Sequence, residues 1–310
     1  MTSNPKISIV IPVYNGSDYL KEAIDSALGQ TSPDFEVIVV NDGSNDGGKT
    51  EAIAKSYGDK IRYFYKENGG VASALNLGIK NMKGEWFAWL SHDDVFSTNR
   101  IESDLLFFEQ NPDAKVIFCK STIIDSQGEV IEDVEYPIDK VTNCCDALIL
   151  GGVDMCTMTI HKFCFEKTGL FNEGNRTNQD VEMTLRLASA FPFYLNSNSV
   201  TFKREHLNRG TYTLSDRKQE DLLRLCNFIY NELRLTDFFP NLGENEQKKS
   251  EAWIYMGNMY SRWGATHYSD ECYKLAILEN RNILHRWIKI LAFNAKKLNN
   301  PILNKLLNKV

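Results

Sequence analysis

Three short polar clusters in the first hundred residues carry the side chains that could do chemistry. Each follows an apolar run, and they read Pro12-Val13-Tyr14-Asn15, Asn41-Asp42-Gly43-Ser44 and Ser91-His92-Asp93-Asp94. An aromatic ring with a hydrogen-bond acceptor nearby suits a nucleobase, for which stacking is worth about 1–3 kcal/mol. Adjacent aspartates suit Mg²⁺ or Mn²⁺, which usually leaves coordination positions for substrate phosphates. The clusters together predict a site for a nucleotide diphosphate and a divalent cation.

The apolar runs before these clusters indicate buried strands that alternate with helices. Residues 7–11 and 35–40 are rich in β-branched side chains, and residues 19–28 between them carry apolar side chains at helical spacing. Further strands are predicted at 61–65 and 86–90, and further helices near 50–57 and 71–82. Such alternation predicts an α/β fold with a mostly parallel central sheet and helices on both faces. Ligands bind beyond the carboxyl ends of strands in such sheets, which is where the clusters fall.

The rest of the chain divides into a mixed part and a helical part. Between residues 97 and 210, strands are predicted near 115–124 and 193–203, and helices near 98–110 and 180–190. After residue 213 the strand signals stop, and helices are predicted near 215–235, 247–263, 266–279 and 283–298. No Gly/Ser-rich or Pro-rich linker separates the two parts. We therefore expect a domain boundary near residue 213, with the two parts packed directly.

The composition excludes several classes of protein. The 310 residues are 43% hydrophobic, and no apolar run approaches the roughly 20 residues that a membrane-spanning helix needs. The first residues lack the features of a signal peptide, so we expect a cytoplasmic protein. The net charge of −6 combines +7 in residues 281–310 with −13 in the remainder, which is not the pattern of a general nucleic-acid binder. Seven cysteines without a C-x-x-C pair disfavour a cysteine metal site.

Longer blocks around the polar clusters resemble the inverting family 2 glycosyltransferases, whose fold is called GT-A. The matching blocks appear in the family's order at residues 7–15, 37–46, 68–78, 84–94, 169–173 and 179–186. The resemblance implies a Rossmann-like GT-A domain over residues 1–213. Within it, residues 1–95 would bind a nucleotide sugar and residues 96–213 would form the acceptor side. An all-α region over residues 214–310 would follow.

The resemblance implies a set of residues that bind the nucleotide sugar. Tyr14 and Asp42 would hold the base, and Val13 and Asn15 would shape the pocket around it. Gly70, in the block that opens the helix near 71–82, would also line the nucleotide-sugar site. UDP is the favoured carrier and dTDP the alternative, since the two bases differ by one methyl group.

The same resemblance implies the residues that act on the sugar. Asp94 would bind Mn²⁺ or Mg²⁺, Asp93 would contact the ribose or share the metal, and His206 would reach the metal or the diphosphate. Asp180 matches the aspartate that takes the proton from the acceptor hydroxyl as general base. Glu182 lies two residues further along the predicted helix, about 200° around its axis, and should face elsewhere.

Two positions depart from the family pattern. Ser91 stands where many relatives have Asp, and Leu75 stands where many have Arg, which leaves the contacts to the donor phosphates undefined. The missing Gln-x-x-Arg-Trp motif and missing membrane helices indicate a non-processive enzyme. We expect transfer of a hexosyl or N-acetylhexosaminyl unit to a hydroxyl of a cell-surface polysaccharide, lipid-linked oligosaccharide or glycoprotein. The alternative is a degenerate transferase that acts as a scaffold through its helical region.

The helical region offers two possible partner surfaces. Residues 253–276 resemble a single tetratricopeptide repeat, which cannot bury its own faces. It must pack on the catalytic domain, on the next helix or on a second copy, and self-association into a homo-oligomer is favoured. Residues 281–310 are basic and amphipathic. They could lie on the anionic inner face of a membrane as a peripheral contact, or they could cap the helical stack.

Overall fold

The computed structural model describes residues 4–149, 154–207 and 218–280. The chain forms two compact units, Met1–Leu225 and Cys226–Val310, so that the division falls within a helix. The domain boundary expected near residue 213, the helix predicted at 283–298 and the basic segment 281–310 lie outside the described residues.

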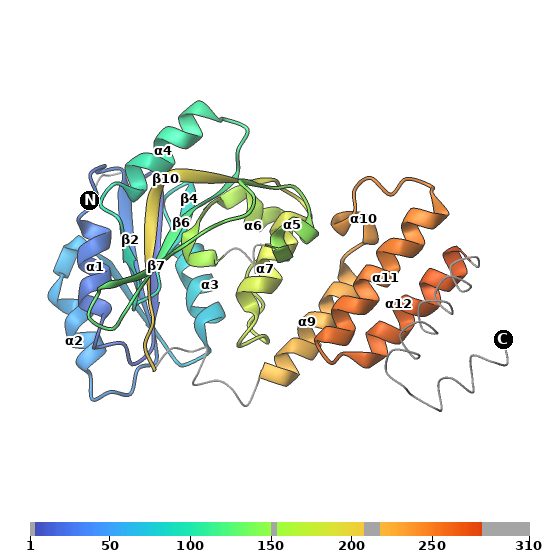
Figure 1. The fold of residues 1–310 in the computed structure, drawn as a ribbon. Coiled ribbons are helices and arrows are strands. Elements are labelled where there is room, and N and C mark those ends of the chain that lie inside the picture. Colours follow the sequence, from blue (N-terminus) through green and yellow to red (C-terminus); the bar gives the residue numbers. More distant parts are fainter. Residues whose placement is uncertain (1–3, 150–153, 208–217, 281–310) are drawn as a thin grey trace. The chain divides into compact units, whose positions relative to one another are not determined.

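The first unit is built on one ten-stranded sheet, which is seen along its edge in Figure 1. The order of its main path is β3-β2-β1-β4-β9-β6-β10-β5, while β7 pairs with β6 and β8 pairs with β10. The strands are β1 (Ile7–Val13), β2 (Phe35–Asp42), β3 (Arg62–Lys66), β4 (Trp86–Trp89), β5 (Val95–Phe96), β6 (Val116–Ile124), β7 (Val130–Val134), β8 (Lys140–Val141), β9 (Met158–His161) and β10 (Phe193–Arg204).

The sheet has a parallel half and a mixed half. Strand β1 runs parallel to β2 and to β4, and β2 runs parallel to β3. Strand β9 runs antiparallel to its neighbours β4 and β6, whereas β6 and β10 are parallel. The parallel half is the α/β arrangement expected from the first ninety residues.

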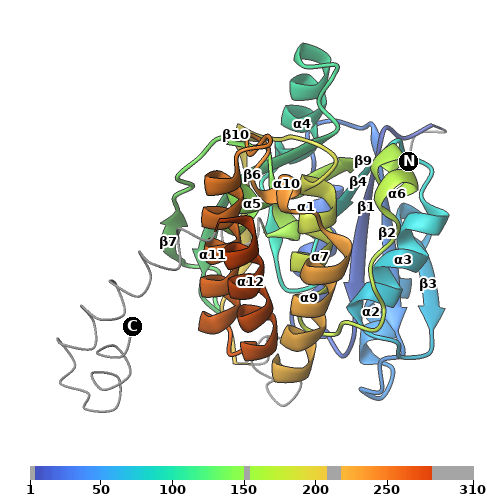
Figure 2. The same cartoon turned by 90° about the vertical axis from the view of Figure 1, so that its right-hand side faces the viewer.

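Helices cover the parallel half on both faces. The helices of the first unit are α1 (Leu20–Leu28), α2 (Lys49–Ser56), α3 (Val71–Asn81), α4 (Arg100–Gln110), α5 (Cys144–Ile149), α6 (Lys162–Thr168) and α7 (Gln179–Ala188). Figure 1 and Figure 2 place α1 and α2 on one face of β1 and β2, and α3 on the other. Ile9 of β1 packs in one core cluster with Ile24 of α1, whereas Val10 faces α3 so closely that a side chain at Gly78 would collide with it. Burial on both faces explains why β1 is apolar throughout.

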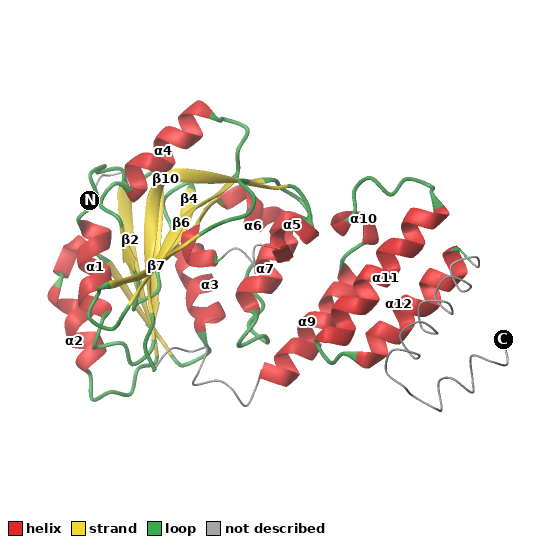
Figure 3. Cartoon of the chain, viewed as in Figure 1, coloured by secondary structure: helices red, strands yellow, loops and turns green. Residues whose placement is uncertain are grey.

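The remaining described residues are helical, as Figure 3 shows, and confirm the expected all-α region. The helices are α9 (Lys218–Glu232), α10 (Leu235–Phe238), α11 (Glu246–Arg262) and α12 (Thr266–Glu279). Helices α11 and α12 form an antiparallel pair, in which the Ser250 hydroxyl donates to the carbonyl of Ala276 and the Ser269 hydroxyl donates to that of Gly257. No helix in the described ranges has the length and apolar content to span a membrane.

Candidate active site

The predicted clusters meet at the carboxyl edge of the parallel half. Val13, the last residue of β1, pairs with Asn41 of β2, and β4 lies on the other side of β1. Asn15 joins the ends of β1 and β2, because its side-chain amide donates to Asn45 at 2.7 Å and accepts from the Asn45 backbone N–H at 2.8 Å. The ring of Tyr14 is 44% exposed, whereas Val13 is buried in the core. Tyr14 is therefore accessible to a ligand, whereas Val13 belongs to the core.

Asp42 anchors the loop that enters α3. The side chain is only 3% exposed. Its Oδ1 accepts from Lys66 Nζ at 2.8 Å and from the Gly69 N–H at 2.9 Å, and its Oδ2 accepts from the Gly70 N–H at 2.7 Å. Gly70 has a φ of 86°, which favours glycine. Two predicted donor-site residues, Asp42 and Gly70, are thus in direct contact.

Asp93 and His206 lie side by side after β4 and β10. The Nε2 atom of His206 is 2.9 Å from Oδ2 of Asp93. Asp94 is buried, and its Oδ1 accepts the backbone N–H of Arg204 at 3.0 Å. The structure therefore brings Asp93 and His206 together, whereas the side chain of Asp94 bonds to the backbone of Arg204.

Arg204 holds the segment with Asp93 and Asp94 in place. No role was predicted for it from the sequence. The side chain is 1% exposed, and its guanidinium donates to the carbonyl of Asp93 at 3.0 Å and to Glu22 at 2.7 Å. It also lies 4.6 Å from the centre of the Tyr19 ring, which in turn is 5.0 Å from the ring of His206. A buried guanidinium with several acceptors fixes its neighbours more firmly than a flexible lysine could.

Asp93, Asp94 and His206 offer few ligands to a divalent cation. Within the described ranges, no group of three or more His, Cys, Asp or Glu side chains is arranged to hold a metal ion. Asp93 and His206 nevertheless bring one oxygen and one nitrogen ligand to the same place. Mg²⁺ is usually bound through one or two carboxylates plus substrate phosphates. Asp93 and His206 are thus a partial set of ligands, which a bound diphosphate would have to complete.

Asp180 is the second residue of α7 and is partly buried. Burial and the neighbouring Asp154 carboxylate raise the pKa of Asp180 to about 6, while Lys203 opposes the rise. Lys203 forms an ion pair of 2.5 Å with Asp154. A carboxylate with a pKa close to neutral is well matched to general base catalysis. Neither Asp154 nor Lys203 was found from the sequence, where nothing distinguishes them from other surface charges.

Glu182 faces away from Asp180, as its position on the helix predicts. Its Oε2 accepts from the side-chain amides of Asn172 at 3.0 Å and Asn175 at 3.3 Å. On the other side, the amide of Asn76 in α3 bonds to both the carbonyl and the N–H of Phe171, each at 2.9 Å. The loop before Asp180 is therefore fixed both to its own helix and to the donor side of the sheet.

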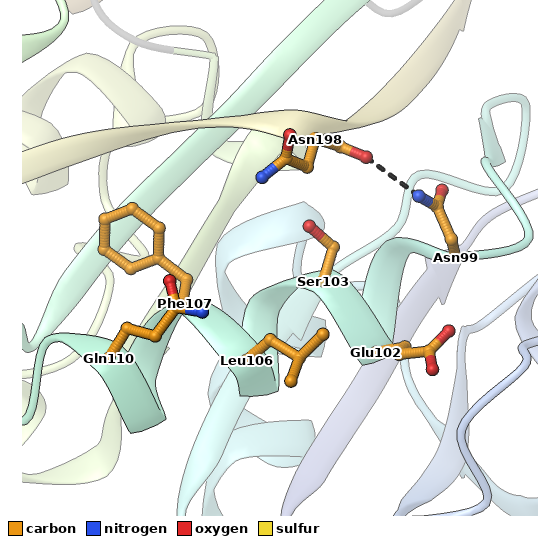
Figure 4. Close-up of a pocket in the computed structure, with 7 residues that line it drawn as sticks. All are labelled: Asn99, Glu102, Ser103, Leu106, Phe107, Gln110 and Asn198. Carbon is orange, nitrogen blue, oxygen red and sulfur yellow. Dashed lines mark hydrogen bonds between the residues drawn. The ribbon is translucent and has the colours of Figure 1, made fainter.

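A separate cavity of about 240 Å³ lies between α4 and β10 and is shown in Figure 4. It is lined by Asn99, Glu102, Ser103, Leu106, Phe107, Gln110 and Asn198. None of these is a predicted site residue, and Glu102 is the one ionisable side chain among them. We therefore assign the chemistry to the open edge of the sheet and not to this cavity.

Comparison with known proteins finds similar sequences over most of the chain. The family model described as glycosyl transferase family 2 matches residues 8–167. An uncharacterised glycosyltransferase of Rickettsia felis is 40% identical over 258 residues, which cover 81% of this chain and 41% of that protein. The chondroitin synthase of Pasteurella multocida is 29% identical over 254 residues, or 78% of this chain and 25% of the synthase. The chain thus spans about two fifths of the Rickettsia felis relative's length.

A solved structure shares the fold. Residues 1–349 of S. aureus TarS, in complex with UDP-GlcNAc, superpose with a TM-score of 0.62 and 17% sequence identity. The match covers 90% of this chain and 92% of the solved one. At this identity the likeness concerns the fold alone.

Proposed function

The chain belongs to glycosyl transferase family 2 and has its GT-A fold, and we propose that it moves a sugar from a nucleotide-diphosphate sugar to an acceptor hydroxyl with inversion. The observation that carries the proposal is Asp180. It is a partly buried carboxyl with its pKa raised to about 6, in the same compact unit as the exposed ring of Tyr14 and the buried carboxylate of Asp42. One unit therefore holds the side chains that would serve as nucleotide platform and as base.

The donor side is suited to a uracil base. The exposed ring of Tyr14 can stack on the base. Oδ2 of Asp42 accepts one hydrogen bond from Gly70, and a carboxylate oxygen can accept two. The remaining lone pair can therefore accept the imide N–H of uracil. Val13 and Asn15 would shape the pocket. UDP is favoured because the similar TarS fold was solved with UDP-GlcNAc, and dTDP remains the alternative.

The acceptor side supplies the base for direct displacement. The acceptor hydroxyl gives its proton to Asp180 while its oxygen forms a bond to the anomeric carbon, and the bond from that carbon to the diphosphate oxygen breaks. With a pKa of about 6, Asp180 is mostly ionised at pH 7 and can take the proton. Mn²⁺ or Mg²⁺ at Asp93, Asp94 and His206 would supply positive charge to the leaving diphosphate.

We propose a growing cell-surface glycan as the acceptor. The support is the family together with the chondroitin synthase relative, which builds a polysaccharide according to its name. A lipid-linked oligosaccharide or a glycoprotein would offer the same attacking hydroxyl, and acceptor panels would separate them.

The first test is a panel of UDP-, dTDP- and GDP-sugars, assayed for Mn²⁺-dependent release of nucleoside diphosphate. We expect release from one donor by the wild type and its loss in Asp94→Ala. Since Asp94 bonds to the backbone of Arg204, circular dichroism should show that the variant is folded. The anomeric configuration of the product, read by NMR, should be inverted. Retention of configuration would contradict the role of Asp180, and a wild type that neither releases nor binds nucleotide would favour the scaffold alternative.

We propose self-association as the role of the helical unit. Leu278 is 72% exposed on α12, and Tyr255 is exposed on α11. Light scattering of the full chain should give at least a dimer, and Leu278→Asp should lower the measured mass. Peripheral contact with an anionic membrane through residues 281–310 is a separate proposal, to be tested by sedimentation with phosphatidylserine vesicles.

A further inference from the structure

Arg176 reaches the donor side of the site from the loop before α7. Its guanidinium lies against Gly70 so closely that a side chain at position 70 would collide with Nη1. The N–H of Gly70 donates to Oδ2 of Asp42 at 2.7 Å. Arg176 therefore stands next to the loop that Asp42 holds, although more than 100 residues separate the two loops in the sequence. Glycine at position 70 is required both by its φ of 86° and by this contact.

The charge of Arg176 is not neutralised by its surroundings. Across the described ranges, no carboxylate lies within ion-pair distance of its guanidinium, and its side chain is partly exposed. The other cation at this loop, Lys66, is paired with Asp42 at 2.8 Å. The α3 segment that follows Gly70 has no basic residue before Lys80, and Leu75 is fully buried. Among the described residues, Arg176 thus brings a positive charge without an ion-pair partner to the side of the predicted nucleotide site.

The backbone of Arg176 is held by a carboxylate from outside the sheet. Asp221 of α9 is 3% exposed, and its Oδ2 accepts from the Arg176 N–H at 3.1 Å and from the Thr177 hydroxyl at 2.9 Å. On the same helix, Arg224 donates to the carbonyl of Gly174 at 3.0 Å. Because these bonds fix the loop, little entropy is lost when Arg176 orders around a ligand.

We propose, building on the proposed function, that Arg176 binds a phosphate of the donor nucleotide. A guanidinium without a carboxylate partner is matched in charge and shape to phosphate oxygens, which it can bind through two parallel hydrogen bonds. The same residue connects donor binding to catalysis, since Asp180 follows it by four residues.

The test is a calorimetric titration of UDP, UMP and uridine into the wild type, Arg176→Gln and Arg176→Lys. We expect Arg176→Gln to weaken UDP binding by about 10-fold or more and to leave uridine unchanged, as the loss of a charged hydrogen bond to phosphate implies. Arg176→Lys should restore part of the affinity, because it keeps the charge and loses the planar fork. Arg262→Gln, the same change at an exposed position of α11, is the control and should match the wild type.

Two results would overturn the inference while leaving the proposed function intact. The first is an Arg176→Gln variant that binds UDP as tightly as the wild type does. The second is a variant that loses affinity for UDP and for uridine by the same factor, which would indicate a collapsed pocket. Asp221→Asn gives a second check, because loosening the loop should weaken UDP binding in the same direction and spare uridine. A wild type that binds none of the three ligands would instead refute the proposed function itself.

Discussion

Replacing Asp180 with asparagine should abolish catalysis and raise stability at the same time. The carboxyl has its pKa raised from 3.8 to about 6 in the folded protein. The folded state therefore holds its proton up to a higher pH than the unfolded chain does. Ionisation of Asp180 disfavours folding above pH 6, and this cost disappears below pH 4. A tenfold change in proton affinity is worth about 1.36 kcal/mol. The raised pKa of Asp180 therefore lowers the free energy of unfolding at pH 8 by about 3 kcal/mol at most.

The assay compares urea unfolding of the wild type and Asp180→Asn from pH 4 to pH 8. We expect equal stability near pH 4 and a variant more stable by up to about 3 kcal/mol at pH 8, because asparagine keeps the shape without the charge. Release of nucleoside diphosphate in the presence of acceptor should fall by about 100- to 10,000-fold. Wild-type activity should rise as the pH passes through about 6.

Glu182→Gln is the matched control for this experiment. Glu182 is two residues away and buried, and it accepts from Asn172 and Asn175 and lies 3.6 Å from Arg186. Its replacement should lower stability at pH 8, since it removes a charge that has partners. The reasoning about Asp180 would be refuted if Asp180→Asn behaved like this control, or if it kept wild-type activity.

Two further predictions concern the donor side and the segment with Asp93 and Asp94. Tyr14→Ala should weaken uridine and UDP alike by about 1–3 kcal/mol, measured by titration, because it removes a stacking surface that is largely exposed and contributes little to folding. Equal affinity in the variant would place the base elsewhere. Arg204→Lys should lower stability by roughly 2 kcal/mol in thermal unfolding, since the carbonyl of Asp93 and the carboxylate of Glu22 lose their donors. It should also weaken Mn²⁺ binding, followed by electron paramagnetic resonance with UDP present, because Arg204 fixes Asp93; unchanged Mn²⁺ affinity would contradict that positioning role.

The sequence by itself determined the elements with a strong local period. The β-branched runs predicted β1 and β2 to within a few residues, and β3, β4, α1, α3, α4 and α7 also lie where the sequence predicted strands and helices. The polar clusters that follow β1, β2 and β4 located the edge where the site lies, because parallel strands place their carboxyl ends together. The two-residue strands β5 and β8 were missed, since so short a segment carries too little alternation to be recognised, and β9 was missed as well.

Only the tertiary structure decided which distant side chains meet. Asp93 and His206 are 113 residues apart, and Asp42 and Gly70 are 28 apart. No role was assigned to Arg204 or Arg176 from the sequence, because their roles depend on burial and on the partners that the fold places beside them. The raised pKa of Asp180 is of the same kind, since it arises from burial and from the Asp154 carboxylate nearby. The sequence thus determines which residue types follow each strand, whereas their charge states and contacts depend on long-range packing.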